Sequence, residues 1–426
     1  MINHWRELYM NRSLFSAVII LLSMSSGYGF SISETPEGWA SQSGGTSGGN
    51  GGTEVTVSSM SQLQSEARSS GKKIIILTKG TYTGDRIPVA SDKTIVGREP
   101  GVLIVGGVSV SKESNVILRN FAIQGNRCET YDDCKGGVDA MSISSNAHHV
   151  WLDHLDIFDG QDGNCDITSG SDFVTVTWCK FWYSYAKEHR YSNLISSKDN
   201  VAGDKGKLNI TYAYCWWADR VDQRMPRGRS GKVHVVNNLY TSREASYACG
   251  PGVDIQMLIE NNVFNNSGSA IKIYDGSPAP AFKSVGNIGT ATNIEWNQGT
   301  VFTPPYTLSL LVDASEVDSM VRPAAGNTMK LGVSEVRTTT GVPIAVRPLI
   351  FAGRTGWTLR NPSSTTITFK VITLNGRTVL PITRLEAGMS FPLPSTASPL
   401  FVRCRSGSIA LTDRYIPPAL SVFPLR

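Results

Sequence analysis

Short apolar runs recur through the middle of the chain at a nearly constant spacing. The runs that begin at Val150 and Val174 are 24 residues apart, those at Ile210 and Val233 are 23 apart, and those at Val233 and Met257 are again 24 apart. Each run alternates apolar and polar positions as a strand does, and a polar pair that often contains Asn follows it. A period in the twenties with so little helical pattern predicts a solenoid, and specifically a parallel β-helix.

Further units begin at Thr94, Val116 and Phe282, and the longer gap between Val116 and Val150 predicts the same unit with an inserted loop. Each unit then forms one coil, stacked about 4.8 Å from the last. Residues at equivalent positions of successive coils therefore become neighbours on one face. A β-sandwich or meander is the alternative fold, but neither would require a fixed period.

Two other segments depart from this pattern. Met60, Leu63 and Ala67 have helical spacing, with Ser61 as a candidate N-cap, and we expect this helix to cover one end of the β-helix. From about Lys330 the chain alternates apolar and polar positions between Gly, Pro and Asn-Gly turns, without the 24-residue period. That pattern predicts a small antiparallel β-sandwich.

The N-terminus has the pattern of an export signal. Arg6 and Arg12 precede an apolar run from Leu14 to Met24, and small residues follow, so we expect cleavage near Gly29. The run is too short for a spanning helix and no later run reaches its length, which predicts a secreted protein without a membrane span. A signal anchor that tethers the protein is the alternative. The expected domains are 1–29, the signal; 30–327, the β-helix; and 328–426, the sandwich.

Composition narrows the class of partner. With 40% hydrophobic and 18% charged residues the chain is globular, and its 41 glycines suit many tight turns. The net charge of +5 favours an acidic partner, whereas the scattered Lys and Arg residues argue against nucleic acid. Of the seven cysteines, Cys128 and Cys134 frame a short polar loop that a disulfide could close, and the others are expected as buried thiols. No CxxC pair supports a zinc site.

An acidic, Gly-rich connection lies between the strands expected at 150–157 and 174–178, and it carries Asp162 and Asp166. On the stacked coils, Asp139 lies one coil earlier. Three carboxylates in one place repel each other unless a cation offsets their charge, and Ca²⁺ takes carboxylate ligands from loops of this kind. The sequence therefore predicts a calcium site, although Asp and Gly also make ordinary turns.

An Arg-rich segment lies further along the chain. Arg220, Arg224, Arg227 and Arg229 precede the strand expected at Val233, two or three coils beyond the acidic loop. This arrangement suits a polymer whose carboxylates bind the cation at one sugar and arginine at another. A solvated surface loop is the alternative.

The motifs together resemble the pectate lyase family, the right-handed parallel β-helix polysaccharide lyases. The matching pieces run in order from Gly38 to Asn327, and they include KTIVG, NVILRNF, DAMSI, VWLDH, DGNCDI and FVTVTW. The segment RMPRGRSGKVHVVNN matches the family pattern R-x-P-x-x-R-x-G-x-x-H-x-x-N-N at Arg224, Pro226, Arg229, Gly231, His234, Asn237 and Asn238.

The resemblance implies calcium-dependent β-elimination on α-1,4-linked polygalacturonate by a monomer, with 4,5-unsaturated oligogalacturonates as products. The resemblance assigns Asp139, Asp162 and Asp166 as calcium ligands. It assigns Arg224 as the base that removes the C5 proton and Arg229 as a contact to the substrate carboxylate. The base role requires neighbouring cations that favour loss of a guanidinium proton. The alternatives are a pectin lyase acting on methyl-esterified pectin, a polygalacturonase-type hydrolase, and a non-catalytic β-helix that binds polysaccharide.

This sequence departs from the family pattern at two places. The family's substrate-binding Lys would stand at Tyr191, and an insertion leaves Arg190 and Lys187 as candidates, of which we favour Arg190. Gly137 replaces a further Asp of some members, which argues against a second calcium. The histidines at 154 and 234 are expected to be structural. The C-terminal module resembles sorting or attachment modules that could hold the protein at the cell surface, with carbohydrate binding or simple stabilisation as alternatives.

Overall fold

The computed structural model describes residues 36–134, 137–331 and, beyond these, 349–353, 356–360, 367–373, 378–386, 390–392, 400–406 and 409–416. The chain separates into two compact units, Met1–Val333 and Ser334–Arg426. The expected export signal at 1–29 lies outside the described residues. In the part of the chain that is described, no helix is both long and apolar enough to cross a membrane.

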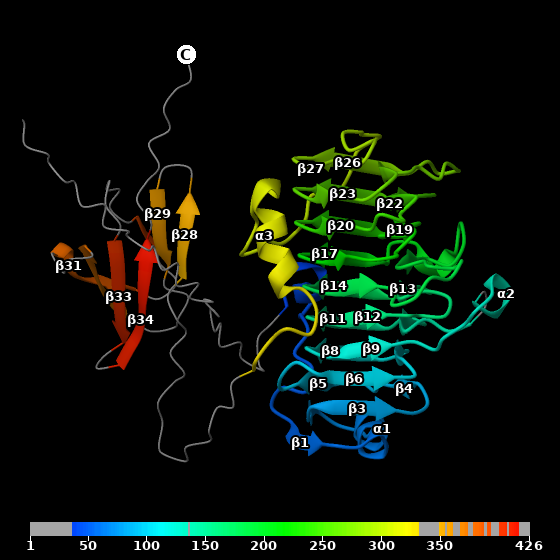
Figure 1. The fold of residues 1–426 in the computed structure, drawn as a ribbon, viewed down its shortest axis with the longest axis horizontal. Helices are drawn as coiled ribbons and strands as arrows, with labels where there is room; N and C mark the ends of the chain where they lie inside the picture. Colours follow the sequence, from blue (N-terminus) through cyan, green and yellow to red (C-terminus); the bar gives the residue numbers. More distant parts are fainter. Residues whose placement is uncertain are drawn as a thin grey trace, which may run out of the picture. The chain divides into compact units, whose positions relative to one another are not determined.

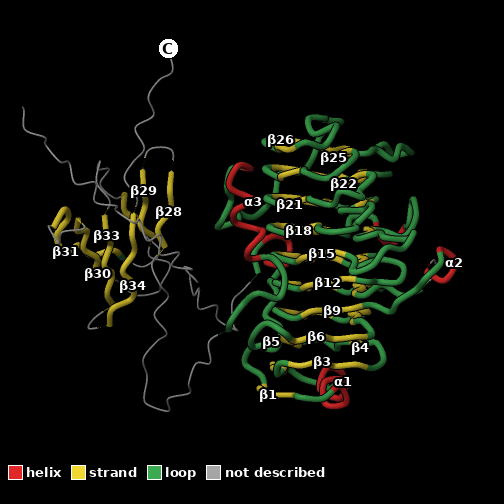
Figure 2. The backbone as a smooth tube through the Cα atoms, viewed as in Figure 1, coloured by secondary structure: helices red, strands yellow, loops and turns green. Residues whose placement is uncertain are grey.

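The larger unit is a parallel β-helix, as the repeat predicted (Figures 1 and 2). Its strands form three parallel sheets, which we name by the number of strands that each contains. The ten-strand sheet contains β1 (Thr53–Val57), β2 (Lys73–Leu77), β5 (Lys93–Gly97), β8 (Ser114–Arg119), β11 (His148–Asp153), β14 (Asp172–Thr177), β17 (Asn209–Ala213), β20 (Lys232–Val236), β23 (Gln256–Glu260) and β26 (Ala281–Val285). The nine-strand sheet contains β3 (Gly80–Thr83), β6 (Val102–Val105), β9 (Ala122–Gln124), β12 (Asp156–Phe158), β15 (Lys180–Trp182), β18 (Trp216–Trp217), β21 (Leu239–Tyr240), β24 (Val263–Phe264) and β27 (Ile288–Gly289). The eight-strand sheet contains β4 (Ile87–Pro88), β7 (Val108–Ser111), β10 (Met141–Ser144), β13 (Cys165–Ile167), β16 (Leu194–Ile195), β19 (Arg227–Gly228), β22 (Tyr247–Pro251) and β25 (Ser269–Ile271).

The register of the ten-strand sheet reproduces the sequence repeat. Val150 pairs with Val174, Val174 with Ile210, Ile210 with Val233, and Val233 with Met257. All five side chains are fully buried, and burying one such side chain stabilises the fold by roughly 1.5–3 kcal/mol. The period therefore follows from a column of core residues, and inserted loops do not break it.

Asparagines form a second column, at the turn between the ten-strand and nine-strand sheets. Asn238 Oδ1 accepts a hydrogen bond from the Cys215 backbone N–H at 2.7 Å, and Asn262 Oδ1 accepts one from Asn238 at 2.8 Å. Asn287 Oδ1 continues the column by accepting from Asn262 at 2.7 Å. Each amide thus satisfies a buried backbone donor of the coil before it, which explains the Asn in the repeated polar pair.

Helix α1 (Met60–Arg68) packs Leu63 and Ala67 into the core at the N-terminal end of the β-helix, where Figure 1 shows it. The expected N-cap, Ser61, was wrong. Ser59 has the extended backbone that a cap needs, and its side chain accepts a hydrogen bond from the Gln62 backbone N–H at 3.3 Å. Ser61 already lies inside the first helical turn.

The remaining helical elements were not predicted. Helix α3 (Ala314–Ala324) buries Val317 and Val321 against a cluster that includes Val236 and Val263. A one-turn helix, α2 (Tyr131–Cys134), lies on a loop that projects from the coils in Figure 1. Two short 3₁₀ turns, η1 (Gly38–Ser41) and η2 (Ala202–Asp204), complete the set among the described residues.

A buried ion pair lies at the end of β11, on the ten-strand sheet. Asp153 Oδ2 lies 2.7 Å from Arg119 Nε and 2.9 Å from His154 Nδ1, and Thr177 donates to Asp153 Oδ1 at 2.7 Å. Burial alone would raise the pKa of Asp153, but His154, Arg119 and the hydrogen bonds together lower it to about 2. His234, on β20 of the same sheet, pairs with Glu260 at 2.7 Å. Both histidines are therefore structural.

The second unit is antiparallel, as predicted. One sheet contains β28 (Leu349–Gly353), β29 (Gly356–Arg360) and β32 (Ser390–Pro392). The other contains β31 (Thr378–Leu385), β30 (Ile367–Thr373), β33 (Leu400–Ser406) and β34 (Ile409–Ile416).

Candidate functional site

The eight-strand sheet brings the acidic and basic segments onto one face. Asp139 lies two residues before β10, and Asp166 lies within β13, where it pairs with Ser142 of β10. Arg224 lies three residues before β19, and Arg229 directly follows it. Because β13, β16 and β19 are consecutive in this sheet, the basic segment lies two coils beyond Asp166.

Asp139 and Asp166 converge beside Gly163. A Cβ at Gly163 would lie 3.0 Å from Asp139 Oδ1 and 3.1 Å from Asp166 Oδ1. Asp139 Oδ1 is buried and accepts no hydrogen bond, whereas Asp166 Oδ1 accepts one from the Leu194 backbone N–H at 2.9 Å. A larger residue at this position would therefore crowd the two carboxylates.

Both carboxylates have raised pKa values. Burial raises the pKa of Asp139 well above its usual range, and the charges of Asp166 and Asp162 raise it further, while Arg86 and Arg224 oppose the shift. Burial likewise raises the pKa of Asp166 to about 7, against the hydrogen bond from Leu194 and the charge of Arg224. A cluster of buried carboxylates whose pKa values remain raised despite nearby arginines is a candidate cation site.

Asp162 belongs to the same cluster electrostatically, but its carboxylate faces another partner. Its Oδ1 lies 2.8 Å from His189 Nε2. Within the described residues, no group of three or more His, Cys, Asp or Glu side chains is arranged around a single point in the manner of a metal site. The converging pair is therefore Asp139 and Asp166, and Asp162 would have to leave His189 to join them.

Arg224 lies over an aromatic ring next to this pair. Its guanidinium carbon is 4.2 Å from the centre of the Tyr191 ring, and its Nε is buried without a hydrogen-bond partner. The Asn193 backbone N–H donates to the Arg224 carbonyl at 2.7 Å, which ties this residue to the coil below. The charge of Arg224 opposes the rise in the pKa of both Asp139 and Asp166.

The basic face continues along β19, β22 and β25. Arg229 Nε donates to the exposed Asp199, and its NH1 donates to the Ser196 carbonyl at 3.2 Å. Arg227 lies over the Tyr274 ring, 3.7 Å from its centre, and burial lowers the pKa of Arg227. Lys272 lies 5.4 Å from the centre of the same ring. Cations and aromatic rings thus alternate along this part of the sheet.

The two candidates for the family's missing Lys have different environments. Arg190 Nε donates to the Arg220 carbonyl at 2.8 Å, and its NH2 lies 3.2 Å from the half-exposed Glu244. Lys187 is only 5% exposed, and its ammonium donates to the carbonyls of Gly160 at 2.6 Å and Gln161 at 2.9 Å. Burial lowers the pKa of Lys187 to about 8.

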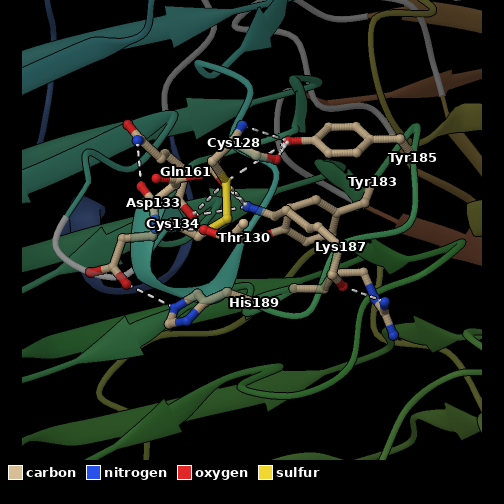
Figure 3. Close-up of a disulfide and its surroundings, with 12 residues drawn as sticks. Cys128, Thr130, Asp133, Cys134, Gln161, Tyr183, Tyr185, Lys187 and His189 are labelled. Carbon is tan, nitrogen blue, oxygen red and sulfur yellow. Dashed lines mark hydrogen bonds and ion pairs between the residues drawn. A yellow bond between two sulfur atoms is a disulfide. The ribbon is translucent and has the colours of Figure 1, made fainter.

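A disulfide joins Cys128 and Cys134, as the sequence suggested, and it lies beside Lys187 (Figure 3). The cysteines at 165, 179, 215 and 249 are free and buried, again as predicted. The side chain of Cys404 lies outside the described set. Gly137, where a further calcium ligand would stand, faces the Gln161 side chain, which a Cβ there would approach to 2.3 Å.

Sequence reasoning missed several residues of this face. Arg86, which lies beside β4 two coils earlier, donates to the Asp139 carbonyl and, at 2.7 Å, to the Ser142 hydroxyl, so it supports the first acidic segment. Tyr191, His189 and Tyr274 also lie in the site. Arg227 carried a signal because it stands inside the Arg-rich motif, and Tyr191 carried one because it stands where the family has its lysine. The others become neighbours only through the stacking of coils.

The donor set fits a hard divalent cation. Carboxylate oxygens are the ligands that Ca²⁺ prefers, and the unpartnered Asp139 Oδ1 faces the space left open at Gly163. The adjacent arginines can bind the carboxylates of an acidic polymer with paired hydrogen bonds. The arrangement is therefore suited to acidic polysaccharide chemistry that develops negative charge.

Comparisons with known proteins agree with this description. The family described as Pectate lyase matches residues 12–329. Pectate lyase plyB of Emericella nidulans is 31% identical over 307 residues, which cover 69% of this chain and 89% of that protein. Pectate lyase B of Colletotrichum gloeosporioides is 35% identical over 274 residues, which cover 62% and 78%. The crystal structure of a Bacillus pectate lyase in complex with trigalacturonate superposes with a TM-score of 0.57 and 25% identity, covering 68% of this chain and 98% of that one.

Proposed function

The chain belongs to the pectate lyase family and is a polysaccharide lyase, and from this premise we propose that it is a secreted, calcium-dependent enzyme that cleaves polygalacturonate by β-elimination. One observation carries the calcium dependence. The buried, unpartnered Oδ1 of Asp139 and the carboxylate of Asp166 converge on the space beside Gly163. Carboxylates so placed need a cation to remain charged together.

In this proposal Asp139, Asp162 and Asp166 hold the calcium ion, with Asp162 moving from His189. Bound calcium would supply positive charge to the uronate carboxylate and so stabilise the charge that develops when C5 loses its proton. Arg224, after losing a guanidinium proton to solvent, takes the C5 proton, and the glycosidic C4–O bond breaks as the C4–C5 double bond forms. Tyr191, which lies under the guanidinium, orients it.

Substrate binding is proposed for the rest of the basic face. Arg229 leaves its ion pair with Asp199 to bind a uronate carboxylate. Arg190 takes the place of the family's lysine and leaves its ion pair with Glu244 to bind another uronate carboxylate. Arg227 and Tyr274 extend the face along the polymer, because a sugar ring can pack on the tyrosine while its carboxylate pairs with the arginine. The enzyme acts as a monomer.

The remaining assignments concern the ends of the chain. We propose that residues 1–29 direct export, that 30–327 form the catalytic domain, and that 328–426 attach the enzyme to the cell surface or bind carbohydrate. The support for these assignments is the sequence pattern at each end.

Mass spectrometry of the products tests the reaction type. Incubation with polygalacturonate should give oligogalacturonates with an unsaturated non-reducing end, each lighter by one water than the product of hydrolysis. Saturated products would instead indicate a hydrolase. A preference for highly methyl-esterified pectin over polygalacturonate would indicate a pectin lyase.

A further inference from the structure

Lys187 uses all its hydrogen-bonding capacity inside the protein. Its ammonium contacts three acceptors: the Gly160 carbonyl at 2.6 Å, the Gln161 carbonyl at 2.9 Å and Cys128 Sγ at 3.4 Å. The residue is 5% exposed. An ammonium group has three N–H donors, so none remains for a polysaccharide.

The loop that Lys187 holds is the one beside the acidic pair. Gly160 and Gln161 immediately precede Asp162, and Gly163 separates the carboxylates of Asp139 and Asp166. The turn is tight, since a Cβ on Gly160 would lie 1.7 Å from the Gly163 carbonyl oxygen. A shift of this loop would therefore displace the space in which the carboxylates converge.

Backbone hydrogen bonds join this loop to the segment that carries Asp139. The Gln161 N–H donates to the Val138 carbonyl at 3.1 Å, and the Ala140 N–H donates to the Gly163 carbonyl at 3.0 Å. Movement of the loop therefore moves both acidic segments together.

The Cys128–Cys134 disulfide loop and the segment that carries Lys187 both contact the 160–163 turn, and Figure 3 shows them beside each other. The Gln161 side chain donates to the Asp133 carbonyl at 2.8 Å. The Tyr185 hydroxyl lies 3.1 Å from both the backbone nitrogen and the carbonyl of Cys128. Two residues beyond Lys187, His189 pairs with Asp162 itself.

We propose that Lys187 positions the Gly160–Gly163 turn, which carries Asp162, and does not contact the substrate. Together with the Cys128–Cys134 disulfide, its buried ammonium fixes the Gly160–Gly163 turn, and this sets the affinity of the acidic cluster for calcium. This inference rests on the proposed calcium dependence, and it reassigns one of the two residues that the sequence offered for substrate binding.

The test compares Lys187→Met with Lys93→Met in the full-length protein. Lys93, on β5 of the ten-strand sheet, is a matched control because it is also buried and its ammonium donates to two carbonyls, those of Gly71 at 2.6 Å and Ser91 at 2.8 Å. Calorimetric titration of the metal-free proteins with Ca²⁺ should show an affinity lowered about 10- to 100-fold by Lys187→Met, the range for loss of a group that supports a metal ligand. Lys93→Met should bind calcium as the wild type does.

Kinetics separate positioning from substrate binding. Lys187→Met should raise the calcium concentration for half-maximal rate, while kcat and the KM for polygalacturonate at saturating calcium stay near the wild-type values. Tyr185→Phe, which removes a hydroxyl and no buried charge, should give a smaller effect in the same direction. It keeps the test valid if Lys187→Met does not fold.

Amide hydrogen exchange of the metal-free proteins tests, without calcium, whether Lys187 and the disulfide loop hold the 160–163 turn in place. Exchange at residues 160–163 should be faster in Lys187→Met, or in Tyr185→Phe, and unchanged in Lys93→Met. Exchange at the wild-type rate in both Lys187→Met and Tyr185→Phe would overturn the proposal. A raised KM for polygalacturonate in Lys187→Met, with its calcium affinity intact, would also overturn it. A wild-type protein that binds no calcium would instead overturn the calcium dependence, while the exchange experiment still decides whether Lys187 holds the loop.

Discussion

Asp139 and Asp166 lie on adjacent coils and share one small space, in which a Cβ on Gly163 would come within 3.0 Å of the first carboxylate and 3.1 Å of the second. Burial raises the pKa of both groups. Two carboxylates so close and so poorly solvated favour an added cation. This relationship links the fold, which creates it by stacking coils, to the proposed chemistry.

Replacing Asp166 by Asn should weaken calcium binding, because ligand charge sets affinity at such sites. Calcium at a hundredfold its Kd should stabilise the wild type by about 2.7 kcal/mol, and this calcium-dependent rise in Tm should be largely absent from the variant. Differential scanning calorimetry measures both. Asp132→Asn, at an exposed position of α2, is the control and should respond as the wild type does. A full calcium response in Asp166→Asn would exclude Asp166 as a ligand.

Arg224→Lys should lower kcat by at least about 100-fold, as expected for loss of a group that transfers a proton. Lysine keeps the positive charge but loses the planar group that lies over Tyr191. Steady-state kinetics on polygalacturonate would measure the change. Arg243→Lys, on an exposed turn four residues before β22, should leave kcat unaffected. Retention of most of the wild-type kcat in Arg224→Lys would contradict the assignment.

Asp199→Asn should lower the KM for polygalacturonate, by at most about fivefold, because it frees Arg229 from an exposed ion pair that the substrate must otherwise displace. Initial rates at low ionic strength would show the effect most clearly, since salt screens such pairs. Asp254→Asn removes an equal charge from another exposed position and controls for net charge. An unchanged or higher KM in Asp199→Asn alone would argue against Arg229 as a substrate contact.

The fold was largely predictable because one apolar residue recurs at the same position of each coil. The column from Val150 to Met257 repeats at coil length, and direct pairing of these residues follows from that spacing. Helix α3 was missed because its apolar positions, such as Val317 and Val321, are few and Pro323 interrupts the helical pattern. Ser59 and Ser61 cannot be separated as caps by residue type, since both are serine and only the backbone conformation distinguishes them.

The candidate site was predictable only in part. The acidic and Arg-rich motifs are local, so Asp139, Asp166 and Arg224 could be named and placed on neighbouring coils. Burial is not local. The sequence shows Lys187 as a cation near a substrate motif, but whether its ammonium faces solvent depends on a disulfide loop that arrives from another coil. Arg86 gave no signal, because its partner Asp139 is 53 residues away.

Asp153→Asn should destabilise the larger unit by about 3–5 kcal/mol at neutral pH, the range for breaking a buried ion pair. The pKa of Asp153 falls from 3.8 to about 2 on folding, so its contribution to stability is complete above about pH 4 and is lost as the pH falls toward 2. Urea unfolding followed by tryptophan fluorescence should show this difference shrinking over that window. Asp318→Asn, in an exposed pair with Arg322, should cost less than about 1 kcal/mol at any pH. A pH-independent difference for Asp153→Asn would contradict the linkage.

The most direct test of the central claim is the rate at which unsaturated product forms from polygalacturonate, followed by the ultraviolet absorbance of its conjugated double bond. The rate should be measured with calcium, after chelation with EDTA, and after calcium is restored in excess. We expect the absorbance to rise with calcium, to stop rising on chelation and to resume on restoration. An undiminished rate in EDTA, or no unsaturated product with calcium present, would contradict the account.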